Sequence, residues 1–304
     1  MPDRAARLTG LVLGAAAGGG FPQWNCGCRQ CTLVRSGDPR VRPATQASVA
    51  VSGNGSDWIV VGASPDLRQQ ILQTPCLWPR TPGRDSPIAG VVLIGGDVDA
   101  IAGLLVLRER QPLTIYAPPA LLDLLDANRI FDVLDPSLVR RVALTPLEPV
   151  PCGGGLTLTL LAMPGKVPLY MEERGATQPE PGPNYAALLQ ANGGSVIVAP
   201  ACAEITDPVR HQLRQADLLF FDGTLFTDDE MITAGLGQKT GRRMGHVPVS
   251  GPGGTLEGLA DLRGRRILLH INNTNPIWLL DSPERRQVEM AGFEIAYDGM
   301  EVQV

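Results

Sequence analysis

Three cysteines near the N-terminus have the spacing Cys-x-Cys-x-x-Cys: Cys26, Cys28 and Cys31. Three thiolates in so short a segment can fill three corners of a tetrahedral zinc site, and a fourth ligand must then come from elsewhere in the chain. Reduced cysteines in a loop and a disulfide are the alternatives. The chain has six cysteines in an otherwise cytosolic-looking composition, which favours a metal over disulfide bridges. We therefore expect a structural zinc knuckle at residues 26–31, after a first strand and the glycine-rich loop 14–20.

Polar residues also collect after apolar segments that are typical of strands. Six of them lie at or just beyond the end of such a segment: Asp97, Asp99, Lys166, Cys202, Asp222 and His270. Strands that deliver polar groups at their ends build a site along one edge of a sheet. Carboxylate, imidazole and thiolate groups together can bind iron, zinc or manganese. Each residue taken alone also has a structural explanation, as a helix cap, a turn residue or a small core residue, so the prediction rests on their convergence.

A glycine-rich loop supplies further charged residues: Lys239, Arg242, Arg243 and His246. The chain has three histidines. His246 and His270 lie in the loops that carry the other candidate residues. His211 lies in a polar helical segment, and we interpret it as a solvated residue.

The elements that must position these residues alternate between strands and helices, which is typical of an α/β protein. We expect strands at residues 11–13, 45–51, 58–61, 88–94, 113–116, 143–146, 156–162, 185–191, 195–199, 218–221, 266–269 and 294–297. We expect helices at residues 67–72, 101–110, 119–128, 207–215 and 282–292. Residues 172–183 are charged and proline-rich, and we interpret them as a mobile loop.

Composition narrows the class of protein. The chain has 304 residues, of which 44% are hydrophobic and 19% are charged, enough for a large core in one or two domains. A net charge of -5 argues against nucleic acid as a partner, because phosphate binding needs a concentrated basic face. We find no apolar stretch of transmembrane length and no convincing signal peptide. We therefore expect a cytoplasmic protein without a membrane partner.

Five motifs together resemble the PqqB family, the B proteins of pyrroloquinoline quinone (PQQ) biosynthesis. They are residues 18–31 (GGGFPQWNCGCRQC), 63–70 (ASPDLRQQ), 217–224 (DLLFFDGT), 239–246 (KTGRRMGH) and 270–276 (HINNTNP). The resemblance runs from about residue 11 to the end of the chain. It implies the metallo-β-lactamase fold, an αββα sandwich of two mixed β-sheets flanked by helices. It also implies that residues 1–304 form a single domain of this type with the zinc knuckle near its N-terminus.

The resemblance also assigns metal positions. The usual motif of this fold, His-x-His-x-Asp-His, corresponds to residues 95–100, in which Asp99 alone keeps its type while Gly95 and Ala100 replace histidines. The usual later histidine is matched by Lys166, and the usual bridging aspartate by Cys202. A hydrolytic two-metal centre is therefore not expected, because most ligands of its first site are missing.

What the resemblance leaves is one metal site, built from Asp99, His270 and some of Asp97, Cys202, Asp222 and His246. In a related member of the fold a histidine supplies the knuckle's fourth ligand, and Asn273 stands at that position here.

The resemblance implies a step in PQQ synthesis, namely iron-dependent hydroxylation of the tyrosine ring of a cross-linked glutamate–tyrosine precursor, with O₂ as co-substrate. One Fe²⁺ held by Asp and His would leave positions open for O₂. His246 would act as general base, with Asp222 and Lys166 as further catalytic candidates. Lys239, Arg242 and Arg243, together with Lys166, would hold the carboxylates of this small-molecule substrate. The alternative is a non-enzymatic carrier that takes part in transport of PQQ or its precursor to the periplasm. The sequence leaves a homodimer open.

Overall fold

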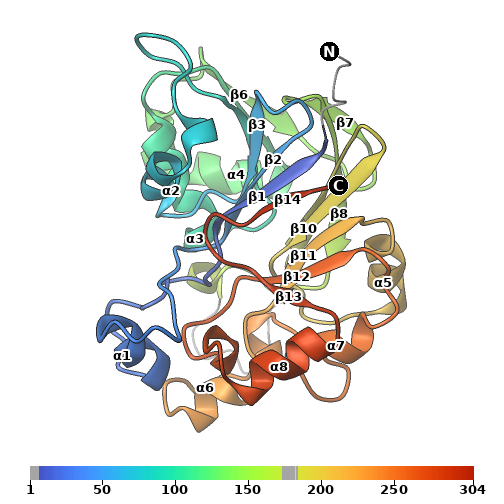
Figure 1. The fold of residues 1–304 in the computed structure, drawn as a ribbon. Coiled ribbons are helices and arrows are strands. Elements are labelled where there is room, and N and C mark those ends of the chain that lie inside the picture. The colour runs from blue at the N-terminus through green and yellow to red at the C-terminus, as the bar shows by residue number, and fades with distance from the viewer. Residues whose placement is uncertain (1–6, 173–181, 183) are drawn as a thin grey trace, which may run out of the picture.

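Two mixed β-sheets packed face to face form the body of the protein, with helices on their outer sides (Figure 1). The structure is a computed structural model that describes residues 7–172, 182 and 184–304. Within these residues each sheet has seven strands, in the orders β14-β1-β2-β3-β4-β5-β6 and β13-β12-β11-β10-β9-β8-β7. This arrangement confirms the αββα metallo-β-lactamase fold.

The first sheet pairs antiparallel strands at one side, from β14 to β3, with parallel strands from β3 to β6. Its strands are β1 (Thr9–Gly14), β2 (Ser48–Ser52), β3 (Trp58–Val61), β4 (Ile88–Val92), β5 (Leu113–Ala117), β6 (Val139–Ala143) and β14 (Glu301–Gln303). The second sheet is antiparallel from β7 to β10 and parallel from β10 to β13. Its strands are β7 (Val150–Cys152), β8 (Leu156–Met163), β9 (Asn184–Ala191), β10 (Gly194–Ala199), β11 (Leu218–Asp222), β12 (Arg265–Leu269) and β13 (Glu294–Ile295).

The α-helices are α1 (Arg29–Arg35), α2 (Leu67–Gln73), α3 (Val98–Ile101), α4 (Pro119–Ala127), α5 (Asp207–Leu213), α6 (Glu230–Thr233), α7 (Thr255–Gly258) and α8 (Pro283–Met290). Short 3₁₀ turns lie at η1 (Pro75–Leu77), η2 (Ala102–Leu107), η3 (Arg129–Val133), η4 (Leu169–Met171), η5 (Arg242–Met244) and η6 (Pro276–Trp278). In Figure 1, α2 and α4 lie outside the first sheet, and α5, α7 and α8 lie outside the second. Helices α1 and α6 project together beyond the sheets at the lower left.

Alternation of side chains along the strands divides the core into two layers. On β3, Ile59 and Val61 join the large cluster between the sheets, whereas Trp58 and Val60 join the cluster beneath α2 and α4. Because successive side chains of a strand point to opposite faces, an apolar strand that is buried on both faces reads as a continuous hydrophobic run. This explains why residues 58–61 were predicted with their observed bounds.

Two predicted elements differ from the structure. Residues 101–110 were expected to form an α-helix, but α3 ends at Ile101 and a 3₁₀ turn follows. Gly103 packs against the backbone of the loop after β3, where a Cβ at this position would be 2.2 Å from the carbonyl oxygen of Ser64. This close contact accompanies the change from α-helix to 3₁₀ turn. The strand expected at residues 143–146 lies earlier, as β6, because Val139 and Val142 pair with β5 while two arginines between them mask the apolar pattern.

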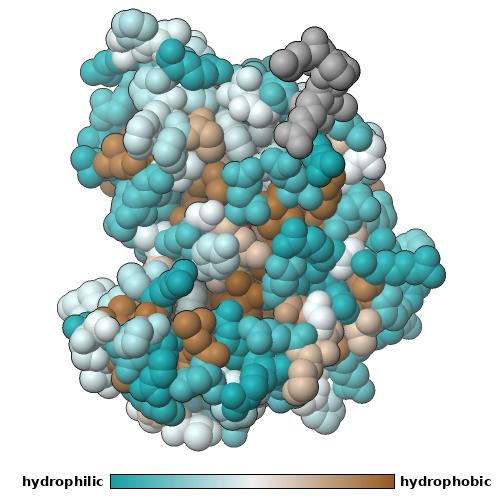
Figure 2. Space-filling model, in the orientation of Figure 1, coloured by the Kyte–Doolittle hydropathy of each residue, from teal (hydrophilic) through white to brown (hydrophobic). Residues whose placement is uncertain are grey.

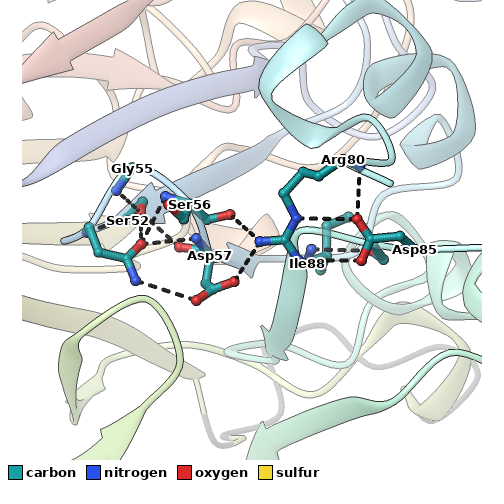
Figure 3. A network of polar contacts seen from close by, with 9 residues as sticks. Ser52, Gly55, Ser56, Asp57, Arg80, Asp85 and Ile88 are labelled. Atoms are coloured by element: carbon teal, nitrogen blue, oxygen red, sulfur yellow. Dashed lines mark hydrogen bonds and ion pairs between the residues drawn. The ribbon is translucent and has the colours of Figure 1, made fainter. Parts of the chain in front are cut away.

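Polar contacts connect the turn between β2 and β3 to the loop that precedes β4 (Figure 3). In the β2–β3 turn, Asn54 Oδ1 accepts from the backbone N–H groups of Ser56 and Asp57. Arg80, from the loop that precedes β4, contacts Asp57 at 3.0 Å and Asp85 at 3.2 Å. Arg80 and Asp57 are about half exposed and Asp85 less so, so each ion pair contributes little to stability. Together they join this loop to the β2–β3 turn.

Most of the surface is hydrophilic, and groups of hydrophobic residues border the hollow on the left of the view (Figure 2). Among residues 7–172, 182 and 184–304, none of the helices combines the length and the apolar character needed to span a bilayer. The loop predicted at residues 172–183 lies outside the described residues, apart from Glu172 and Gly182.

Candidate functional site

A cavity of about 560 Å³ opens where strands of both sheets end. Six of the predicted site residues line it: Asp97, Asp99, Lys166, Lys239, His246 and His270. Small and apolar residues, among them Gly18, Ala47 and Ile94, form much of the remaining wall. Segments far apart in the sequence therefore meet at one edge, as the positions of the polar residues at strand ends predicted.

Asp99 and His270 face each other across the two sheets. Asp99 lies on α3 after β4, and His270 follows β12; Asp99 Oδ2 is 3.0 Å from His270 Nε2. Gly18 leaves room for this carboxylate, since a Cβ at that position would lie 3.2 Å from Asp99 Oδ2. His270 has a left-handed backbone with φ 58°, a conformation that non-glycine residues adopt mainly where the surroundings impose it.

Charge couples this pair. Burial alone would lower the pKa of His270, but the Asp99 carboxylate, with smaller contributions from Asp222 and Asp97, raises it above its ordinary value. Burial likewise acts to raise the pKa of Asp99, but the bond with His270 outweighs it and lowers the pKa. Both directions indicate a carboxylate facing a positively charged partner.

Thr224, which the sequence analysis missed, sets the hydrogen-bond directions beneath the two histidines. Its hydroxyl lies 2.7 Å from Asp222 Oδ1, 2.9 Å from His270 Nδ1 and 3.0 Å from His246 Nδ1. A hydroxyl carries one proton, and the carboxylate of Asp222 is the strongest acceptor nearby. Thr224 therefore donates to Asp222 and accepts from His270 Nδ1–H.

This assignment determines what the Asp99–His270 pair can hold. With Nδ1 protonated, His270 Nε2 faces the carboxylate in one of two ways. As an imidazolium, the state that the raised pKa favours, it donates an N–H to Asp99; as a neutral ring it presents a lone pair, and a cation then bridges the two side chains. Imidazole and carboxylate ligands about 2.1 Å from an ion and at right angles lie about 3.0 Å apart. The donor set and the observed 3.0 Å spacing thus fit a metal ion held by Asp99 and His270, with its other positions toward the cavity.

Asp222 and Cys202 were expected among the possible metal ligands. Asp222 forms a group with His246 and His270 whose ligand atoms lie within 4.8 Å of one another, close enough to hold a metal ion. Asp222 is fully buried and accepts four hydrogen bonds, from Cys202 N, His246 Nδ1, Thr224 N and Thr224 Oγ1. In this arrangement the four hydrogen bonds hold the carboxylate beneath the two histidines. Cys202 lies outside the cavity wall, and its thiol donates to the carbonyl oxygen of Glu204 at 3.1 Å. Burial, with the nearby Asp222 carboxylate, raises its pKa to about 12.

Three cations meet on one carboxylate beside the cavity. Glu172 Oε2 is 2.7 Å from Lys239 Nζ, and its Oε1 is 3.4 Å from Arg243 and 3.7 Å from Lys166. The Lys239 hydrogen bond and the neighbouring cations hold the pKa of Glu172 below its ordinary value. Arg242 lies apart from this cluster, because its guanidinium donates to the carbonyl oxygens at Pro252 and Gly253.

The three knuckle cysteines surround one amide. Asn273 Nδ2 lies 3.1 Å from the sulfur of Cys26, 3.6 Å from that of Cys28 and 3.5 Å from that of Cys31. Cys28 also caps α1, accepting from the backbone N–H of Cys31. Burial acts to raise the pKa of Cys26, but hydrogen bonds from Cys28, Cys31 and Asn273 lower it overall. The three sulfurs converge as a zinc site requires, and Asn273 occupies the position of the fourth ligand, where its amide oxygen would face the ion after a flip.

Glu230 connects the knuckle region to the cavity wall. Its carboxylate accepts from the Thr274 hydroxyl and from Phe226 N, and the carbonyl oxygen of Thr274 accepts from Gln30 on α1. Burial raises the pKa of Glu230 to about 7. The neighbouring Met231 lines the cavity, so this acid lies between the two candidate metal positions.

Comparison with known proteins agrees with the fold and the motifs. The model of the beta-lactamase superfamily domain matches residues 57–271. Coenzyme PQQ synthesis protein B of Gluconacetobacter diazotrophicus is 54% identical over 310 residues, covering 96% of this chain and 98% of that protein. The protein of the same name from Rhizobium meliloti is 51% identical over 304 residues, covering 99% of this chain and 100% of that protein.

Solved structures give the same result. A crystal structure of Zn²⁺-bound PqqB from Methylobacterium extorquens matches with a TM-score of 0.94 at 45% identity, covering 97% of this chain and 100% of that chain. A diphosphatase of the PhnP family matches with a TM-score of 0.69 at 19% identity, covering 98% of this chain and 97% of that chain, and shares the fold alone.

The knuckle geometry predicts that Asn273 controls zinc retention. Asn273→Asp keeps the side-chain shape and provides a carboxylate, a more usual zinc ligand, so this variant should release zinc to a coloured chelator more slowly than the original protein. Asn273→Ala, which removes the ligand, should release zinc roughly tenfold faster or more. Equal release rates in all three proteins would show that Asn273 is not the fourth ligand.

The position of Thr224 predicts that Thr224→Val loosens both histidines. The valine has nearly the same shape but leaves the buried His270 Nδ1–H without its acceptor, which costs roughly 1–3 kcal/mol of folding free energy. Urea unfolding measures this cost, and ¹⁵N spectra report the imidazole nitrogens of the chain's three histidines. Thr224→Ser should restore both readouts. A valine variant with unaltered stability and spectra would contradict the assignment.

The raised pKa of Glu230 predicts a pH-dependent stability. The folded protein holds this proton more tightly than the unfolded chain, so its contribution is full below an unfolded pKa of 4.5 and is lost as the pH rises through about 7. Glu230→Gln should therefore be more stable than the original protein near neutral to alkaline pH, by up to ~3 kcal/mol, and the gain should vanish in acid. Urea unfolding across this pH range measures the difference, with the exposed Glu109→Gln as control. A gain that is constant with pH would refute the linkage.

Proposed function

This chain belongs to the family of coenzyme PQQ synthesis protein B, and from that membership we propose that it acts in PQQ synthesis as an iron-dependent hydroxylase. The substrate class is a small, cross-linked glutamate–tyrosine precursor, with O₂ as co-substrate. The observation that carries the proposal is the Asp99–His270 pair at the cavity, whose 3.0 Å spacing suits one metal ion with open positions.

Asp99 and His270 would hold Fe²⁺, the imidazole through Nε2 and the carboxylate through Oδ2. One imidazole and one carboxylate are part of the ligand set typical of non-haem iron oxygenases. When bound, Fe²⁺ would supply activation of O₂ beside the substrate ring. Zn²⁺ at Cys26, Cys28 and Cys31 would have a structural role.

His246 suits the role of general base toward the substrate phenol. Its Nδ1–H donates to the buried carboxylate of Asp222 at 2.8 Å, which fixes the ring and leaves Nε2 as the acceptor. His246 also lines the cavity. A base oriented by a buried carboxylate is the arrangement by which a histidine takes a proton and is stabilised as the imidazolium. Asp222 is then a positioning residue rather than a ligand.

Lys166 and Lys239 line the cavity, and Arg243 joins them at Glu172. Ammonium and guanidinium groups in this position would hold the carboxylates of an amino-acid substrate through charge-assisted hydrogen bonds. Arg242 supports the loop from outside this group, through its bonds to residues 252 and 253.

A second candidate function, the carrier of PQQ or its precursor, is favoured by what surrounds the metal pair. Gly95, Ala100 and Lys166 stand where metallo-β-lactamase folds usually place histidines, and all three line the cavity. An ammonium group in the same cavity disfavours a second cation. Anaerobic loading followed by elemental analysis separates the candidates, since zinc alone supports the carrier and zinc together with iron supports the hydroxylase.

The hydroxylase proposal predicts that His270→Ala abolishes both iron binding and oxygen incorporation into the precursor, because it removes one of two ligands. Zinc content should be unchanged, since no histidine is among the knuckle residues. The measurements are metal content after anaerobic loading and mass spectrometry of the product.

His211→Ala provides the matched control, because His211 lies exposed on α5 and its loss should alter neither readout. Full turnover by His270→Ala would refute the assignment.

A further inference from the structure

The Glu172 carboxylate lies among three cationic side chains, a position that would also suit the carboxylate of a substrate. Its side chain is 7% exposed, and Lys166 and Arg243 beside it are 13% and 12% exposed. Lys239 donates to it at 2.7 Å. Two of these cations, Lys166 and Lys239, also line the cavity, so the cluster forms part of the cavity's charged wall.

The carboxylate is not needed to hold its own segment. The preceding turn η4 is attached to the loop before α3 by two other hydrogen bonds. Tyr170 Oη donates to the carbonyl oxygen of Gly96 at 2.9 Å, and the backbone N–H of Leu169 donates to Asp97 Oδ1 at 3.2 Å. The three cations therefore explain the position of the Glu172 carboxylate better than the needs of the backbone do.

We infer that Glu172 is an internal occupant of a carboxylate-binding subsite formed by Lys166, Lys239 and Arg243, and that a ligand carboxylate takes its place. The nitrogen atoms that now face Glu172 can donate to a ligand carboxylate instead. Glu172 then keeps Lys166 and Arg243, the two largely buried cations, paired while no ligand is bound, which avoids the cost of uncompensated charge. It also sets a threshold, because a ligand must bring a carboxylate that competes with the internal one.

The inference deepens the proposed function and rests on it for the identity of the substrate. The test is a binding measurement on protein that keeps its zinc but has not been loaded with iron, so its failure is distinct from failure of the hydroxylase proposal, which the His270 variant decides. The apparent affinity of a ligand is its intrinsic affinity multiplied by the fraction of sites that are open to it. Removal of the occupant should therefore tighten binding.

The experiment is calorimetric titration of the zinc-containing, iron-free protein with PQQ, which carries several carboxylates. Glu172→Gln keeps the shape of the side chain and removes its charge. We expect it to bind PQQ about tenfold more tightly than the original protein, with a smaller gain at high salt because the competition is ionic. Lys239→Gln, which removes a donor of the subsite, should bind more weakly.

Glu109→Gln changes net charge by the same amount at an exposed position and should leave affinity unchanged. Glu172→Ala repeats the test without an amide that could still accept hydrogen bonds. Equal affinity of the original protein and both Glu172 variants, weaker binding by those variants, or no binding of PQQ to any variant would overturn the inference.

Discussion

The hydrogen bond from the Thr224 hydroxyl to Asp222 fixes the direction of the others beneath the cavity. Once this single proton is assigned, His246 and His270 must both present N–H toward the second sheet. The other nitrogen of each ring is then the one available to an ion, a proton or a ligand. A buried carboxylate with four donors thus orients two imidazoles without contacting any ligand itself, as outer residues do in metal and catalytic sites.

One short segment connects both candidate metal positions. His270 follows β12, and Asn273, three residues later, lies among the knuckle sulfurs. Asn272 between them contributes to the cavity wall, and Thr274 bonds to both Glu230 and Gln30. The knuckle, α1 and α6 therefore anchor the loop that carries His270, which accounts for the left-handed backbone that this residue maintains.

Much of this architecture could be predicted from the sequence because it depends on local patterns. Apolar runs predicted most of the strands, and polar residues at their ends predicted Asp99 and His270 as neighbours, while His246 was identified in a glycine-rich loop. The pattern could not show how each polar residue is held. Cys202 and Asp222 have the types of metal ligands, but only the structure shows that both are buried and that Asp222 is hydrogen-bonded beneath the two histidines. Thr224 was not among the predicted site residues, although its place directly after Asp222-Gly223 was the available signal. Glu172 depends on contacts with residues about 70 positions away, which no local pattern reveals.

Asp99 and His270 belong to different layers of the sandwich, one following β4 and the other following β12. An ion bound by both residues would cross-link the two layers. The affinity for that ion would depend on how the apolar faces of the two sheets pack, since a small shift of one layer relative to the other alters the distance between the donor atoms. Substitutions of apolar residues between the two sheets, far from any polar group, would in this way change the affinity of the Asp99–His270 pair for its ion.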